Sequence, residues 1–129
     1  MNLAGPRPSY DRRPVSEAAS ALYEDALVWD MTLPWVEGYA DEDITLPRFK
    51  AAGVDLISLT VNDFPGSIGG STRQIAAVKA SISERSDHLT FVHSVEDIRQ
   101  AKRVGKLALT LNLQETNSLE RSLEMIQVF

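Results

Sequence analysis

Apolar residues follow two spacings along this chain, one typical of helices and one typical of strands. From Val15 to Leu27 they recur three and four positions apart, which predicts an amphipathic helix. The run Val54–Val61 is β-branched and almost wholly apolar, as in a strand covered on both faces. Leu107–Leu113 predicts another strong strand. Strand and helix alternate, which predicts an α/β fold with a parallel sheet.

Caps and glycines divide the rest of the chain into further elements. Beyond the first helix, which Ser16 caps, helices are predicted over 45–53, 71–82, 94–105 and 117–129. Two of them open on capping-box patterns, Ser71–Gln74 and Asn117–Glu120. A first strand is predicted at 27–31 and a brief one at 89–93. Residues 1–14, rich in Pro and Arg, are expected to be a flexible arm, and 15–129 a single domain.

Side chains alternate along a strand, so each strand can be divided into two faces. The four leucines of 107–113 share one face. The opposite face carries the smaller or polar residues Ala108, Thr110, Asn112 and Gln114. The same division assigns Ser58, Thr60 and Asn62, and Asp30 and Thr32, to the polar face of their strands. A (β/α)8 barrel explains this pattern, with Asp30, Thr32, Asn62 and Gln114 at its mouth. An open doubly wound sheet is the alternative.

Three strong strands are too few for a complete barrel, and the last helix reaches Phe129 without a capping residue. We therefore expect a partial (β/α)8 barrel, roughly the first three strands with their helices. A sheet with two open edges is prone to pair with other chains. Self-association of the 129-residue protein is accordingly expected.

Composition narrows the class of protein. Charged residues make up 24% and hydrophobic residues 43% of the chain, as in an ordinary globular domain. No apolar run approaches the ~20 residues that span a bilayer, and there is no cysteine for a disulfide or a thiolate site. We expect no membrane association and a cytoplasmic location. The net charge of −5 argues against a nucleic-acid partner.

Acidic residues dominate the segment from Pro14 to Pro47, which contains eight of them and no Lys or Arg. This segment is either a solvated acidic surface or a negative rim that attracts cations or amines. The glycine-rich loop Gly66–Ser71 lacks the lysine of a nucleotide-binding loop and is interpreted as a plain connection. His88 and His93 are interpreted as surface or hydrogen-bonded histidines. No catalytic residue is assigned.

Four segments together resemble the N-terminal part of the membrane (renal) dipeptidase family. They are ALVWDMTLPW (26–35), LPRFKAAGVDLISLTV (46–61), EDIRQAKRVGKLALTLNLQE (96–115) and SLERSLEMIQVF (118–129). The resemblance implies a (β/α)8 barrel that uses two zinc ions to hydrolyse dipeptides, often with a D-residue at the C-terminal position. A small-molecule or dipeptide substrate is therefore expected.

The family's metal-ligand positions are altered in this chain. The family's His-x-Asp before Leu-Pro corresponds here to Asp30-Met31-Thr32, and its bridging glutamate corresponds to Gln114, with Glu115 beside it. The resemblance therefore implies Asp30, Gln114 and Glu115 as the metal positions, and we assign Thr32 and Asn62 to substrate binding. Glu115 would reach the site only through a local bulge.

These observations support two hypotheses of different classes. In the first, the chain is the N-terminal portion of a dipeptidase-like metallohydrolase and is inactive alone. In the second, it belongs to a non-catalytic barrel relative that binds small molecules or serves assembly. Histidines at the ends of later strands would distinguish the enzyme from the binding module.

Overall fold

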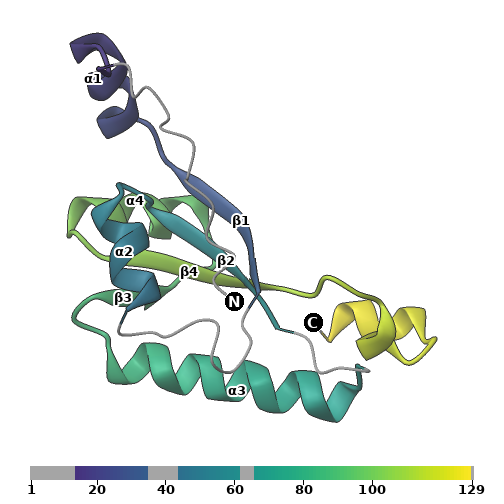
Figure 1. Cartoon of the computed structure of the whole chain (residues 1–129). Coiled ribbons are helices and arrows are strands. Elements are labelled where there is room, and N and C mark those ends of the chain that lie inside the picture. The colour runs from purple at the N-terminus through teal and green to yellow at the C-terminus, as the bar shows by residue number, and fades with distance from the viewer. Residues whose placement is uncertain (1–13, 35–43, 62–65, 129) are drawn as a thin grey trace, which may run out of the picture.

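The computed structural model describes residues 14–34, 44–61 and 66–128. One sheet contains the parallel strands β1 (Trp29–Pro34), β2 (Leu56–Thr60), β3 (Leu89–Phe91) and β4 (Leu107–Asn112). The helices are α1 (Glu17–Asp25), α2 (Thr45–Ala51), α3 (Ile68–Glu84) and α4 (Val95–Arg103), followed by the 3-10 turns η1 (Asn117–Leu119) and η2 (Leu123–Gln127) (Figure 1). The alternation of helices and parallel strands confirms the predicted α/β class. All but the last residue of the predicted arm, 1–14, lie outside the described residues.

The strands lie in the order β1-β2-β4-β3, so the three strands that the sequence predicts most strongly are adjacent. The brief strand β3 is a fourth member of the sheet, at the outer edge of β4. It pairs only with the first half of β4, from Leu89 opposite Leu107 to Phe91 opposite Leu109. In the part of the chain that the structure describes, no strand covers this edge of β4 beyond Leu109.

Helices α2 and α3 cover the face of the sheet that carries the large apolar residues. Their shared core includes Leu46 of α2, Val78 of α3, and Ile57, Leu59 and Leu109 of the strands. Helix α4 packs on the opposite face through Ile98 and Ala101, against Leu56 and Ala108. The predicted division of β4 is therefore confirmed. Towards the C-terminal ends of β2 and β4, the face that α4 leaves uncovered carries polar side chains.

Strand β1 departs from the predicted division. Its register with β2 is regular at Asp30 opposite Ile57 and again at Leu33 opposite Leu59, with an irregularity between them. Leu33 packs with the core under α2 and α3, whereas Leu27 packs with the cluster under α4. The prediction that Leu27 shares the face of the large apolar residues is wrong: one extra residue in β1, between Asp30 and Leu33, puts Leu27 and Leu33 on opposite faces.

Helix α1 begins at its predicted cap, where the Ser16 hydroxyl accepts from the Ala19 N–H (3.2 Å). It has no buried residue, and Figure 1 shows it standing away from the sheet. Tyr23 of this helix contacts the rest of the protein, because its hydroxyl donates to the Ala52 carbonyl (2.9 Å). Gly53 has φ +88°, and a Cβ there would come within 2.6 Å of the Tyr23 ring. Glycine therefore suits both the backbone and the contact.

Two helix predictions are wrong. Helix α3 begins at Ile68, because the Ser67 hydroxyl accepts from the Gly70 N–H (3.0 Å), and Ser71 is buried inside the helix. Residues 117–129 do not form one helix. Glu120 and Arg121 lie between η1 and η2 in the chain. Their φ values of 48° and 63° belong to the left-handed region, so a right-handed helix cannot continue through them. Within the described residues, no helix is both long and apolar enough to cross a membrane.

Candidate functional site

A polar network joins the C-terminal halves of β2 and β4. The Asn112 amide nitrogen donates to the Ser58 hydroxyl (2.8 Å) and carbonyl (3.2 Å), and its amide oxygen accepts from the Thr60 hydroxyl (3.0 Å). The register places Thr60 opposite Asn112, so the two side chains lie on the same face. Ser58 and Thr60 are buried. The alternation of β2 and β4 was the signal for this face, but sequence reasoning did not assign these three residues to the site.

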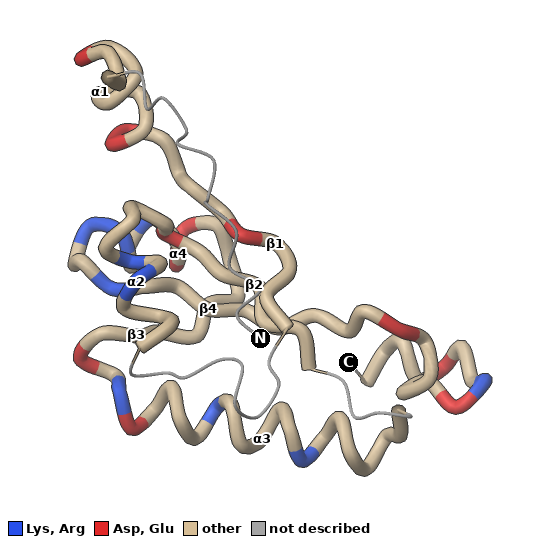
Figure 2. Tube along the Cα trace, in the orientation of Figure 1, with Lys and Arg blue, Asp and Glu red and all other residues tan. Residues whose placement is uncertain are grey.

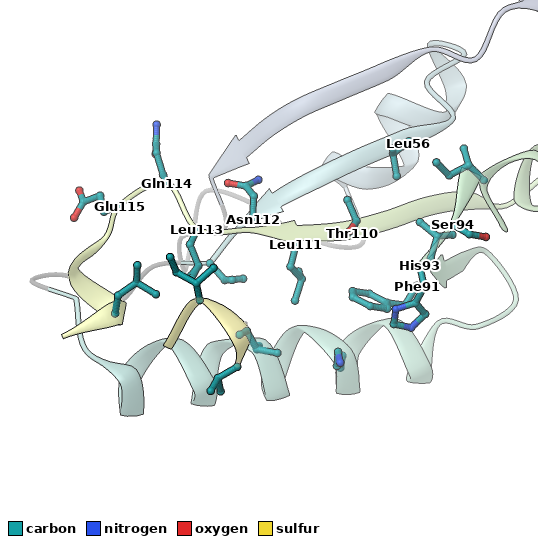
Figure 3. Close-up of a pocket in the computed structure, with 18 of the residues that line it drawn as sticks. Leu56, Phe91, His93, Ser94, Thr110, Leu111, Asn112, Leu113, Gln114 and Glu115 are labelled. Carbon is teal, nitrogen blue, oxygen red and sulfur yellow. The ribbon is translucent and has the colours of Figure 1, made fainter. Parts of the chain in front are cut away.

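Gln114 and Glu115 follow β4 after one intervening residue, Leu113. Figure 3 shows Gln114 on the same side as Asn112, while Leu111 and Leu113 point to the opposite side, towards α3. Gln114 is exposed, and its amide has no hydrogen-bond partner among the described residues. Glu115 points away from Asn112, and its carboxylate accepts from the Asn117 amide (2.7 Å). The mouth of the sheet is thus neutral at Gln114, with Glu115 turned outward as predicted for a strand without a bulge.

The structure does not bring Asp30 to Gln114. Asp30 is level with Ile57, which is level with Leu109, three positions before Asn112. At about 3.3 Å per residue, this offset is roughly 10 Å along the strands, and Gln114 lies two residues farther on. The Asp30 carboxylate accepts from the Thr32 N–H (3.1 Å) and so supports the irregular part of β1. Asn62 lies outside the described residues.

The described side chains do not fit a two-zinc centre. Among residues 14–34, 44–61 and 66–128, no three His, Cys, Asp or Glu residues gather closely enough to hold a metal ion. Asp30 and Glu115 are hydrogen-bonded within their own segments, and Gln114 carries no charge. His88 and His93 are exposed, and His93 stacks edge-on against Phe91 with ring centroids 5.0 Å apart. Both histidines therefore lie at the surface, as predicted.

A cavity of about 890 Å³ follows the uncovered edge of β4. Its walls include Leu111 of β4, Leu113 just after that strand, Ile75 of α3, Phe91 of β3 and Ile126 of η2. Asn112 and Gln114 also line it, at the end near the mouth (Figure 3). The cavity therefore combines an apolar wall with a few polar groups, which is typical of sites that bind small molecules.

The carboxyl groups whose pKa is lowered lie away from the polar end of this cavity. Hydrogen bonds from the backbone N–H of His93 and from Ser94 hold the pKa of Asp97 below its usual range. The Arg103 guanidinium lowers the pKa of Glu96, and the Ser122 hydroxyl lowers that of Glu124. Each shift follows from a local hydrogen bond at the surface. These carboxyls are ionised near neutral pH and are poor general acids.

Solved structures of other proteins share this fold. The chain is similar to an amidohydrolase from Pseudomonas aeruginosa (TM-score 0.71, 23% identity), covering 85% of this chain and 32% of that one. It is also similar to the probable dipeptidase PvdM from the same organism (TM-score 0.66, 16% identity), covering 86% of this chain and 34% of that one. No family model and no curated protein matches the sequence. This chain thus spans about a third of the solved structures and has the α/β fold of that part of an amidohydrolase barrel.

Proposed function

We propose that this chain forms the N-terminal wall of a dipeptidase-like metallohydrolase barrel. The observation that carries the proposal is the likeness of fold to an amidohydrolase and a probable dipeptidase over 85% and 86% of the chain. The polar network at the C-terminal ends of β2 and β4 supports it, because active sites of such barrels form at that end of the strands. The substrate class we propose is dipeptides, on the sequence resemblance described above.

In this proposal the chain positions substrate rather than reacting with it. The Asn112 amide is held from two sides by Ser58 and Thr60, so this part of the wall is rigid. Gln114 presents an amide with donor and acceptor capacity on the same side. Such a group suits the amide or carboxylate of a short peptide. Thr32 and Asn62 are proposed to extend this binding surface.

The proposal includes zinc only if residues outside the described part of the chain supply most of its ligands. At the metal positions that the resemblance implies, the described residues supply one carboxylate within β1, Asp30, and one beyond β4, Glu115, and these lie apart. Two adjacent dications require several negative or imidazole ligands. We therefore assign no hydrolytic step to this chain by itself. Asp30, Gln114 and Glu115 remain the positions to examine in a complete barrel.

The test compares the longest protein that the reading frame encodes with the 129-residue chain. We expect the longer protein to hydrolyse dipeptides with bound zinc, to lose turnover with a chelator, and to be impaired by Gln114→Ala. The 129-residue chain should be inactive in the same assay. A longer protein that is folded and loaded with zinc, yet hydrolyses no dipeptide, would contradict the proposal.

A second candidate is a barrel relative that binds a small molecule without catalysis. Neutral residues at Thr32 and Gln114, where the resemblance implies charged ligands, favour it. Calorimetry on the longer protein distinguishes the two functions. Dipeptide binding that is unaffected by a chelator and is not followed by cleavage would support the binding protein over the hydrolase.

A further inference from the structure

The backbone of β4 has hydrogen-bonding groups without partners along its uncovered edge. Successive residues of the strand bond to alternate sides, with Ala108 and Asn112 bonded towards β2 and Leu109 bonded towards β3. The same alternation directs the N–H and C=O groups of Leu111 to the uncovered edge. Neither Leu111 nor Leu113 has a backbone partner on that side among the described residues. Such groups form a template on which another extended chain can pair.

The cavity of about 890 Å³ lies along these backbone groups and forms a groove beside the strand. Ile75 of α3 and Val95 of α4 both line it, and these two helices pack on opposite faces of the sheet. Ile126 and Val128 also line it, although they are 59% and 68% exposed. Exposed apolar side chains around a concave surface are typical of a binding site. Both walls of the groove can therefore accept the alternate side chains of an extended chain.

The groove has a cation near one end and a carboxylate near the other. The Lys79 ammonium lies 4.9 Å from the centroid of the Phe91 ring, which is level with Leu109, and it makes no ion pair with any described residue. Glu115 is six positions beyond Leu109, or about 20 Å along an extended chain. Figure 2 shows basic positions along α3 and an acidic position on the chain just after β4. The two ends of the groove therefore differ in the sign of their charge.

We propose that this groove binds a short free peptide, of about six residues in extended form, as an added strand antiparallel to β4. In this direction the C-terminal carboxylate of the peptide meets Lys79, and its N-terminal ammonium meets Glu115. A parallel peptide would bring like charges together at both ends. The peptide backbone would bond to Leu111 and Leu113, and alternate apolar side chains would face Ile75. This binding needs no metal and no turnover, so its failure and that of the function proposed above are distinguishable.

The first experiment titrates a hexapeptide of alternating valine and threonine, with free ends, into the 129-residue protein by calorimetry. Two further versions carry N-methyl groups on opposite sets of alternate amides. Only one set faces the edge of β4 in an added strand, so one version should bind within twofold of the parent and the other at least tenfold more weakly. The amide protons of Leu111 and Leu113 should exchange more slowly when the parent peptide is bound. Equal binding of the two methylated versions, or unchanged exchange at Leu111, would contradict strand addition.

A matched pair of protein variants tests the direction of the peptide. Lys79 is exposed, so Lys79→Gln leaves the core intact. It should weaken binding of the free-acid hexapeptide at least fivefold and leave binding of its C-terminal amide unchanged. Arg73→Gln, at another exposed cation of α3 that does not line the groove, should change neither. An unchanged affinity of the Lys79→Gln protein for the free acid would contradict the antiparallel direction.

Two other occupants of the uncovered edge would give different results. A dimer in light scattering that the hexapeptide does not dissociate would assign the edge to a second copy of this chain. Slow exchange of the Leu111 amide in the longer protein, without peptide, would assign the edge to a strand of the same polypeptide. Either result would overturn the proposal.

Discussion

The two ends of the sheet are stabilised in different ways. At the N-terminal end, the buried carboxylate of Asp55 accepts from the Val28 N–H (3.1 Å) and the Lys102 ammonium (2.9 Å), and Lys102 also donates to the Ala26 carbonyl (2.7 Å). These bonds connect the segments that lead into β1 and β2 with α4. At the C-terminal end, neutral groups bond across two strands and the chain then becomes exposed. We call the N-terminal end around Asp55 the closed end and the C-terminal end around Asn112 and Gln114 the open end. The comparison indicates that the closed end determines stability, while polar groups at the open end are available to bind a ligand.

The largest effect is expected at the closed end. Asp55→Ala removes a carboxylate whose side chain is 4% exposed and leaves Lys102 and the Val28 N–H without it. Breaking a buried pair on one side costs about 3–5 kcal/mol. Urea unfolding should therefore show a loss of this size in the free energy of unfolding. Asp87→Ala, at an exposed aspartate, is the control and should stay within about 0.5 kcal/mol of wild type.

A smaller effect is expected at the open end. Asn112→Ala leaves the buried Ser58 and Thr60 hydroxyls without their shared partner. The expected loss is about 1–3 kcal/mol in the free energy of unfolding. Gln114→Ala, on the same side but exposed, should cost less than about 0.5 kcal/mol. Equal losses in the two variants would remove the distinction between a structural Asn112 and a free Gln114.

A still smaller effect, on the pH dependence of thermal stability, is expected at the start of α4. The ionised Asp97 accepts from the His93 and Ser94 N–H groups (both 3.0 Å), which lowers its pKa in the folded state. A carboxyl with a lowered folded-state pKa stabilises the protein above its unfolded pKa, and this contribution is lost as the pH falls through the folded value. Asp97→Asn should therefore lower Tm at neutral pH and match wild type in strong acid. A Tm difference that is constant with pH would contradict this linkage.

The smallest effect concerns zinc. Because Asp30, Gln114 and Glu115 do not converge, the 129-residue chain should bind Zn²⁺ weakly and hydrolyse no dipeptide. Calorimetry with Zn²⁺ and a dipeptide assay measure both. Turnover that disappears with chelator and in Asp30→Ala would place the ligands in this chain after all. Loss of zinc binding in Glu115→Ala would assign to Glu115 the position given to Gln114.

The interior of the sheet was predictable from the sequence, because burial on both faces leaves a long apolar run. Leu107 to Leu113 and Val54 to Val61 are such runs, and the division of the leucines from Asn112 follows from alternation alone. The Ser94–Asp97 capping box, with both of its hydrogen bonds formed, lies where Ser94 was predicted to cap a helix. These elements depend on neighbours in sequence.

The parts that were predicted wrongly depend on distant contacts. Ser71 has the local sequence of a helix cap, but its hydroxyl lies 2.6 Å from that of Ser118, inside the protein. Glu120 has a left-handed backbone, and its carboxylate accepts from the Ile68 N–H (3.3 Å) at the start of α3. The irregularity in β1 shifts Asp30 relative to β2. None of these three features has a local sequence signature, so the candidate site was less predictable than the fold.

The pairing of β2 with β4 has a consequence during synthesis on the ribosome. Thr60 and Asn112 are 52 residues apart, and every residue of β2 is buried in the finished sheet. At about 5–20 residues per second, β2 leaves the ribosome roughly 3–10 s before its partner. During this interval an apolar strand has an open edge, which is the state most prone to aggregate. A chaperone that binds extended apolar segments, acting on the nascent chain in this interval, should therefore raise the yield of soluble protein more than one that acts after release.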